Sequence, residues 1–113
     1  MNIIQEFDTI AAISTPLGTG GVGVIRISGD KSFDIAAKIS TKKEFKPNYI
    51  THAWILDNDK KVDEVIILPF KTPNSYTGED VIEIQCHGGV NIVRIILEFV
   101  LANGARHAEK GDF

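Results

Sequence analysis

Cysteine is almost absent from this sequence, and several other features that would point to a particular class of protein are also missing. The single cysteine, Cys86, excludes an intrachain disulfide, and no zinc motif can be written because His52, His87 and His107 show no metal-ligand spacing. A chain of 113 residues needs no such staple, since it can bury roughly two thirds of the surface that its unfolded form exposes. We therefore expect a reducing compartment and no metal site.

Long apolar runs are missing as well. The longest, Ile95 to Leu101, is interrupted by Glu98 and falls far short of the roughly 20 residues of a membrane-spanning helix. The first residues do not resemble a signal peptide, because Gln5, Glu6 and Asp8 break the only apolar start. The sequence therefore predicts a soluble, cytoplasmic protein that does not contact a membrane.

Positive charge is scarce. The formal net charge is −3 and the sequence pI is about 5.5, whereas a protein that binds nucleic acid by itself neutralises phosphates with a clustered Lys/Arg surface. The only basic cluster, formed by Lys42, Lys43 and Lys46, is typical of a solvated loop. The composition argues against a stand-alone nucleic-acid-binding protein.

The glycines are concentrated in Gly18 to Gly23, which matches the G-x-G-x-x-G pattern of dinucleotide-binding proteins. In those proteins a helix follows the glycines directly, but here β-branched residues with a period of two follow them. The Lys-Ser/Thr ending of a phosphate-binding P-loop is also absent. We expect these glycines to shape a tight turn or to let the backbone approach a ligand or partner closely.

The length suits a single domain, and hydrophobic periodicity predicts its elements. The predicted order is β-β-α-β-β-β-α-β, which favours an α+β fold with a two-layer mixed β-sheet and two helices. The predicted strands are Thr9 to Ser14, Val24 to Ser28, Tyr49 to Leu56, Val62 to Phe70, Val81 to His87 and Arg106 to Glu109, and the predicted helices are Lys31 to Ile39 and Asn91 to Ala102.

Local signals refine this prediction. Asp30 is expected to cap the first helix, Asp57 to Lys60 to form a hairpin turn, and Gly104 to end the second helix. Pro69 and Pro73 are expected to interrupt the strand ladder and leave an irregular loop from Lys71 to Asp80. The expected apolar stripe of the first helix is Phe33, Ala36, Ala37 and Ile39.

The second helix is apolar around most of its circumference. Only a narrow stripe of Asn91, Arg94 and Glu98 is polar. A helix of this kind is buried against more than one surface, and we expect a dimer interface or a second domain to supply the additional cover.

The stretch from Ser75 to Gly89 contains the most informative chemistry, and its strand alternates between two faces. Cys86 falls on the apolar face and is predicted to be a buried small hydrophobe. It cannot easily pair with His87 as a nucleophile with its base, because neighbouring strand residues point in opposite directions. In the turn before the strand, Glu79 and Asp80 are expected to be solvated carboxylates.

Two charged residues in the middle of strands are candidates for a binding site. Glu83 could accept two N–H donors from a planar heterocycle, and Arg26 projects from another predicted strand. Each could equally be a paired structural charge. The pair Gly88 and Gly89 opens the second helix, where free N–H groups favour an anion or a polar ligand.

Several stretches, taken together and in order, resemble the N-terminal domain of the bacterial tRNA-modifying GTPase family called MnmE or TrmE. These stretches are Asp8 to Ala12, Pro16 to Gly23, Arg26 to Gly29, Pro73 to Asp80 and His87 to Gly89. The ending from Ala105 to Phe113 also resembles the family, with departures at Lys110 and Asp112. The resemblance covers essentially the whole chain.

The resemblance implies that residues 1–113 form a single N-terminal domain that dimerises and binds a tetrahydrofolate derivative, the 5-formyl or methylene form, in a fold similar to folate-binding aminomethyltransferase domains. It implies that Arg26 and Glu83 contact the folate and that this chain holds no catalytic residue. GTP hydrolysis with magnesium and potassium belongs, in the family, to a G domain that this chain lacks. The family acts with a flavin-dependent partner, MnmG or GidA, on the wobble uridine of tRNA.

Two alternatives remain open from the sequence. The chain could be a pure dimerisation module that uses the helix Asn91 to Ala102, or it could be a free-standing folate-dependent transferase. The final residues, Gly111 to Phe113, carry no polar tail or stop signal. We therefore expect a piece of a longer protein, in which tRNA is held mainly by other parts.

Overall fold

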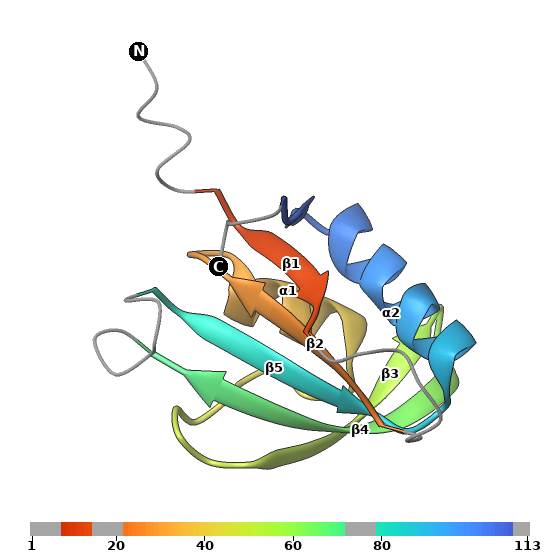
Figure 1. The fold of residues 1–113 in the computed structure, drawn as a ribbon. Helices are drawn as coiled ribbons and strands as arrows, with labels where there is room; N and C mark the ends of the chain where they lie inside the picture. Colours follow the sequence, from red (N-terminus) through yellow and green to blue (C-terminus); the bar gives the residue numbers. More distant parts are fainter. Residues whose placement is uncertain (1–7, 15–21, 72–78, 110–113) are drawn as a thin grey trace.

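The structure is a computed structural model, and it describes residues 8–14, 22–71 and 79–109. Its elements follow the predicted order (Figure 1). They are β1 (Ile10–Ile13), β2 (Gly23–Ser28), α1 (Ser32–Ile39), β3 (Thr51–Asp57), β4 (Lys60–Phe70), β5 (Val81–Cys86), α2 (Val90–Ala102) and β6 (Arg106–His107).

The strands form one mixed sheet in the order β3-β4-β5-β2-β1-β6. All neighbours are antiparallel except β1 and β6, which are parallel. Strand β5 lies between β4 and β2. Arg26 of β2 and Glu83 of β5, which are 57 positions apart in the chain, therefore lie directly opposite one another. The predicted last strand is shorter than expected, since it ends at His107.

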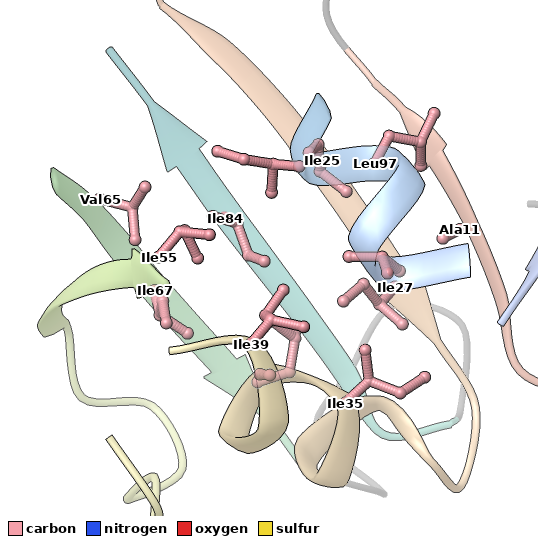
Figure 2. Close-up of a cluster of buried hydrophobic side chains, with 14 of the residues drawn as sticks. Ala11, Ile25, Ile27, Ile35, Ile39, Ile55, Val65, Ile67, Ile84 and Leu97 are labelled. Atoms are coloured by element: carbon pink, nitrogen blue, oxygen red, sulfur yellow. The ribbon is translucent and has the colours of Figure 1, made fainter. Parts of the chain in front are cut away.

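Both helices pack against the same face of the sheet (Figure 1). Figure 2 shows this core, in which side chains from the strands meet those of α1 and α2. Ile25 and Ile27 on β2 and Ile82 and Ile84 on β5 are fully buried, as the period of two requires when one sheet face is covered. The predicted two-layer α+β fold is confirmed.

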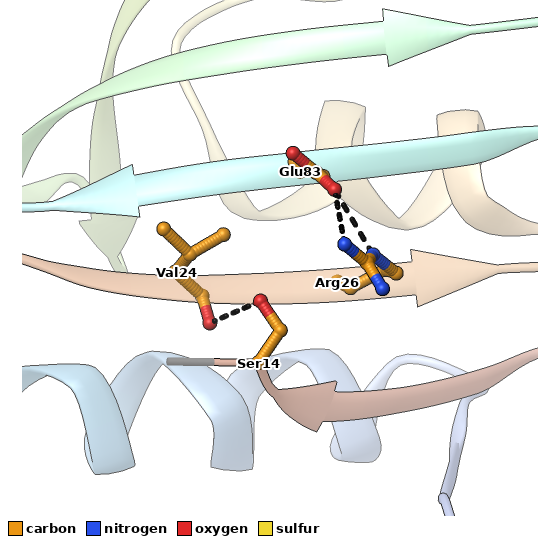
Figure 3. A network of polar contacts seen from close by, with 4 residues as sticks. All are labelled: Ser14, Val24, Arg26 and Glu83. Atoms are coloured by element: carbon orange, nitrogen blue, oxygen red, sulfur yellow. Dashed lines mark hydrogen bonds and ion pairs between the residues drawn. The ribbon is translucent and has the colours of Figure 1, made fainter. Parts of the chain in front are cut away.

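The opposite face of the sheet is covered by neither helix, and we call it the open face (Figure 3). On this face the residues near the middle of the central strands are half-buried. Ile10, Ser28 and Val81, which pair with one another at one end of the strands, are buried. The half-buried residues of β2, β4 and β5 on this face include Val24, Arg26, Leu68, Glu83 and Gln85. The prediction that β5 has one core face and one polar face is confirmed.

The β3–β4 hairpin turns through Asn58 and Asp59, which have φ angles of 48° and 75°. Both central residues of a type I′ turn need positive φ, and Asn and Asp tolerate this conformation better than most residues. Asp57 pairs with Lys60 across this two-residue loop, so the predicted hairpin turn is confirmed.

The predicted cap of α1 is wrong. The N-cap is Lys31, with no side-chain capping bond. The hydroxyl of Thr9 accepts a hydrogen bond from the Lys31 N–H at 3.0 Å instead, so the polar group comes from the residue that precedes β1. The expected apolar stripe also omitted Ile35, which is fully buried, whereas Phe33 is only partly buried.

Pro69 does not interrupt the sheet, which corrects a second prediction. It lies within β4 and pairs with Ile82 of β5. The carbonyl of Pro69 points away from β5 and accepts a hydrogen bond from the Asn48 N–H at 2.8 Å. On this side β3 no longer pairs with β4, because the last pair between them is Thr51 with Ile67. The nitrogen and carbonyl of one strand residue face the same side, so the missing N–H of Pro69 costs no ladder bond. The predicted loop after β4 and Pro73 lie mostly outside the described residues.

Helix α2 ends as predicted, with Gly104 at a φ of 122° just after the C-cap. One side of α2 packs on the sheet through Val93, Ile96, Leu97 and Val100. Its outer side leaves Ile95 37% exposed. The second covering surface expected for this helix stays a prediction.

Candidate ligand-binding site

The two candidate residues chosen from the sequence lie against each other on the open face (Figure 3). Arg26 donates from Nε at 2.9 Å and from a terminal nitrogen at 2.8 Å, and both bonds end on the same oxygen, Oε2, of Glu83. The side chains are 25% and 13% exposed. The two bonds fix the guanidinium against the carboxylate at the middle of the sheet.

The strand register produces this pair. Arg26 of β2 and Glu83 of β5 are direct Cα partners, and directly opposed side chains on one face are about 5 Å apart at Cβ. The sequence could indicate that both lie mid-strand, but only the register brings them together. A cross-strand pair of opposite charge contributes about 0.2–1 kcal/mol, while loss of one partner leaves a half-buried charge without its counterion.

Apolar and polar neighbours flank the pair along the same row of the sheet. Leu68 of β4 lies opposite Glu83, and Ala12 of β1 lies opposite Arg26. Gln85 lies two residues further along β5, on the same face. A flat ligand placed here would meet charge and amide groups at its edge and a leucine under its ring.

Two backbone N–H groups just before α2 donate to a side chain of β4. Asp63 of β4 accepts from the N–H groups of His87 at 2.8 Å and Gly88 at 3.2 Å through one oxygen. His87 Nδ1 also lies 3.0 Å from the carbonyl of Glu64. The segment that precedes α2 is thereby tied to β4, and the expectation of a polar ligand at the N–H groups of the first turn of α2 stays a prediction.

Sequence reasoning missed this role of Asp63. A carboxylate in an otherwise alternating strand was visible, but its partners lie 24 and 25 residues further along the chain. Only the position of β4 beside β5 identifies them.

Cys86 and His87 do not form a catalytic pair, as predicted. Cys86 is fully buried in the core, whereas His87 is exposed. Burial, with a smaller contribution from the charge of Asp63, raises the pKa of the Cys86 thiol from 9.0 to about 12. The thiol is neutral at physiological pH and is not a nucleophile in this fold.

The turn carboxylates are less solvated than expected. The hydroxyl of Ser28 donates a hydrogen bond to the Glu79 carboxylate at 3.2 Å. Lys71 forms an ion pair with Asp80 at 3.4 Å, and the Asp80 side chain is only 17% exposed. The prediction holds for Glu79, which is exposed, and is wrong for Asp80. Both carboxylates help to hold the entry to β5.

Residues 8–14, 22–71 and 79–109 contain no group of three or more His, Cys, Asp or Glu side chains arranged to hold a metal ion. None of the helices in these ranges has the length and apolar character needed to cross a bilayer.

The fold is a two-layer α+β domain with a partly buried charge pair on the sheet face that neither helix covers. A family model described as "GTP-binding protein TrmE N-terminus" matches residues 9–113. The chain belongs to this family of N-terminal domains of tRNA-modifying GTPases.

Curated relatives agree with this assignment. The tRNA modification GTPase MnmE of Caldicellulosiruptor saccharolyticus is 54% identical over 115 residues, which cover 96% of this chain and 25% of the relative. The proteins of the same name from Pseudothermotoga lettingae and Thermotoga maritima are 48% and 44% identical, with 94% of this chain and 24% of each relative covered. The chain spans about a quarter of the length of these relatives.

Proposed function

We propose that this chain binds a tetrahydrofolate derivative on its open face and so supplies a one-carbon unit for modification of C5 of the wobble uridine in tRNA. The observation that carries the proposal is the Arg26–Glu83 pair, partly buried and fixed by two hydrogen bonds on a face that neither helix covers. Membership of the TrmE N-terminal family gives the context of tRNA modification.

Each residue of the pair has a distinct part in this proposal. The carboxylate of Glu83 accepts hydrogen bonds from the amino group and ring N–H of the pterin, because a carboxylate presents about four acceptor positions and is matched to a planar pair of donors. Arg26 orients that carboxylate and holds the cofactor by charge or by stacking on its ring. The bound folate, in its 5-formyl or methylene form, carries the one-carbon unit, and the chain positions it.

The rest of the reaction lies with other parts and partners. GTP hydrolysis, with magnesium and potassium, belongs to a G domain outside this chain, and a flavoprotein of the MnmG or GidA kind provides the redox partner in the cytoplasm. The net charge of −3 favours tRNA binding mainly by those other parts.

The test is a calorimetric titration of 5-formyltetrahydrofolate into the protein expressed from the complete reading frame that contains this chain. Glu83→Gln keeps the shape of the side chain but removes its charge, and Arg26→Met keeps most of the volume. Each is expected to weaken binding by between about tenfold and a hundredfold, because a hydrogen bond to a charged group contributes about 1.5–3 kcal/mol.

Glu64→Gln is the matched control. The Glu64 carboxylate also contacts a side chain across the strands, the imidazole of His52, but the Glu64 side chain is 51% exposed and this contact lies on the β3 side of β4, away from Arg26. Its replacement is expected to leave folate binding unchanged. If Glu83→Gln and Arg26→Met bind the folate as tightly as the parent, the proposed site is wrong.

A second candidate function, dimerisation, is favoured by two exposed apolar side chains of α2, Val90, which is 39% exposed, and Ile95, which is 37% exposed. We propose a homodimer through this chain, and Ile95→Glu is expected to weaken it because the substitution buries a charge in the contact. Sedimentation over a concentration series measures the effect. Arg94→Glu, at an exposed position of the polar stripe, is the control, and a parent protein that is strictly monomeric at high concentration contradicts the idea.

A further inference from the structure

The charge of this chain is unevenly distributed along the sequence. Residues 38–61 contain six lysines and three carboxylates, a formal charge of +3, so the other residues together carry −6. The net charge of −3 therefore conceals one basic segment. Its lysines, all of them exposed, are Lys38, Lys42, Lys43, Lys46, Lys60 and Lys61.

The fold places this segment along one edge of the sheet. Strand β3 is the outermost strand on that side, and the connection from α1 borders it. The Thr41 N–H donates to the carbonyl of Trp54 at 3.0 Å, and the Trp54 N–H donates to the Thr41 hydroxyl at 3.1 Å. Further along, the Asn48 N–H donates to the carbonyl of Pro69 and so holds the connection against β4. Figure 1 shows this connection running along the edge of the sheet, below β4.

Two aromatic side chains on this edge each lie beside an ammonium group. Nζ of Lys46 lies 4.3 Å from the centre of the Tyr49 ring, and Nζ of Lys61 lies 4.8 Å from the centre of the Trp54 ring. Tyr49 is 58% exposed despite its size, and Trp54 is half-buried. Five positions of chain separate the two rings, which are therefore at most about 18 Å apart at Cα. We call Lys42, Lys46, Tyr49, Trp54 and Lys61 the basic edge.

The lysines of the basic edge have no carboxylate partner. Cations elsewhere on the sheet form ion pairs, as Arg26 does with Glu83. In the part of the chain that the structure describes, Lys42, Lys46 and Lys61 form none. An aromatic ring holds an ammonium group in place without neutralising its charge, since the ring itself has no net charge. These three charges can therefore attract an anion from solution.

We propose that the basic edge binds a single-stranded stretch of the tRNA on which the protein acts. One base stacks on Tyr49, Trp54 offers a second ring, and the lysines hold the phosphates between them. Aromatic rings beside cations that follow the backbone are the means by which proteins bind single-stranded nucleic acids. The inference rests on the part of the proposed function that brings tRNA to this protein, and it does not involve the Arg26–Glu83 pair.

The composition of the edge favours RNA over a protein partner. Lysine is depleted in the cores of protein–protein interfaces, whereas three unpaired lysines around two rings suit a chain of phosphates and bases. Membership of a family of tRNA-modifying GTPases supplies such a partner. The exposed carboxylates of Asp57 and Asp59 in the β3–β4 hairpin would repel phosphates, so the contact ends before that turn. The basic edge therefore adds a local contact to the tRNA binding of the other parts.

The test measures binding of a fluorescently labelled, unmodified tRNA to the protein from the complete reading frame, by anisotropy over a series of salt concentrations. Tyr49→Ala is expected to weaken binding by about fivefold to a hundredfold, the effect of one stacked base, and to leave the salt dependence unchanged. Tyr49→Phe keeps the ring and is expected to bind as the parent does. In the double variant Lys46→Gln with Lys61→Gln, the slope of log K against log salt is expected to fall by about 1.4, because each phosphate contact to a single strand contributes about 0.7.

Lys31→Gln is the matched control for charge. Lys31 is exposed and lies at the N-cap of α1, outside the basic edge, so its replacement is expected to leave the slope unchanged. The inference is wrong if Tyr49→Ala and the double variant keep the parent's affinity and slope, if Tyr49→Phe loses as much as Tyr49→Ala, or if Lys31→Gln lowers the slope as much as Lys46→Gln does alone. A parent that binds 5-formyltetrahydrofolate but no tRNA overturns the inference and leaves the folate site standing. The expected losses of tRNA binding in a parent that binds no folate have the opposite meaning.

Discussion

Replacement of Gly29 by alanine is expected to destabilise the fold by about 2–5 kcal/mol, from backbone strain together with overpacking. Gly29 has a φ of 136°, a conformation that residues with a Cβ rarely adopt. A Cβ at this position would lie 2.6 Å from the Cα and Oγ1 atoms of Thr9 and 2.8 Å from the carbonyl oxygen of Asp8. These distances are far inside van der Waals contact.

The surroundings of Gly29 cannot easily move away. The N–H of Gly29 donates to the carbonyl of Asp80 at 2.8 Å, the carbonyl of Thr9 accepts from the Arg106 N–H, and the hydroxyl of Thr9 accepts from the Lys31 N–H. The first residues of β1, the exit of β2 and the start of α1 are therefore joined at one point. A shift of Thr9 to admit a methyl group would break at least one of these bonds.

Gly89→Ala separates strain from steric clash. Gly89 also has a positive φ, 88°, but a Cβ there would meet nothing within 4 Å. Only the strain remains, so this control is expected to lose about 1–2 kcal/mol. Urea unfolding of the two variants and the parent measures the difference. A loss at Gly29 no greater than that at Gly89 contradicts the tight contact with Thr9.

The thiol of Cys86 is expected to react with iodoacetamide about a thousandfold more slowly in the folded protein than in urea at neutral pH. The pKa of this thiol is raised from 9.0 to about 12, first by burial and then by the charge of Asp63. Only the thiolate reacts, and each unit of pKa lowers its fraction tenfold when the pH is well below the pKa. Burial against solvent slows the reaction further.

The same shift makes stability depend on pH. Above pH 9 the unfolded chain loses its Cys86 proton while the folded chain keeps it, so the free energy of unfolding falls as the pH rises from about 9 towards 12. Cys86→Ala removes this contribution, and the difference between the two proteins isolates it from other titrating groups. A folded thiol that is alkylated as fast as the unfolded one contradicts the burial of Cys86.

Much of the fold follows from patterns along the chain. Alternation in β2 and β5 assigned Ile25 and Ile84 to the core and Arg26 and Glu83 to the opposite face, because a period of two is a local property of extended backbone. The Asn58 turn was also predicted, since its residue type favours positive φ.

Two of the failed predictions share one physical cause. Asp30 was expected to cap α1, but Thr9, the residue that precedes β1, supplies the polar contact. Pro69 was expected to interrupt the strand ladder, but its nitrogen faces the side where β3 has already ended. In each case a contact between distant segments outweighed a local preference, and the sequence contains no local record of that contact.

The sequence by itself determined the order of the elements, the face on which each strand residue lies, and the choice of Arg26 and Glu83, because periodicity and residue type are local. Only the tertiary structure decided that these two charges are direct partners and that Asp63 accepts from the N–H groups of His87 and Gly88 before α2. These relations depend on strand order and register, which arise when the whole sheet packs against its helices.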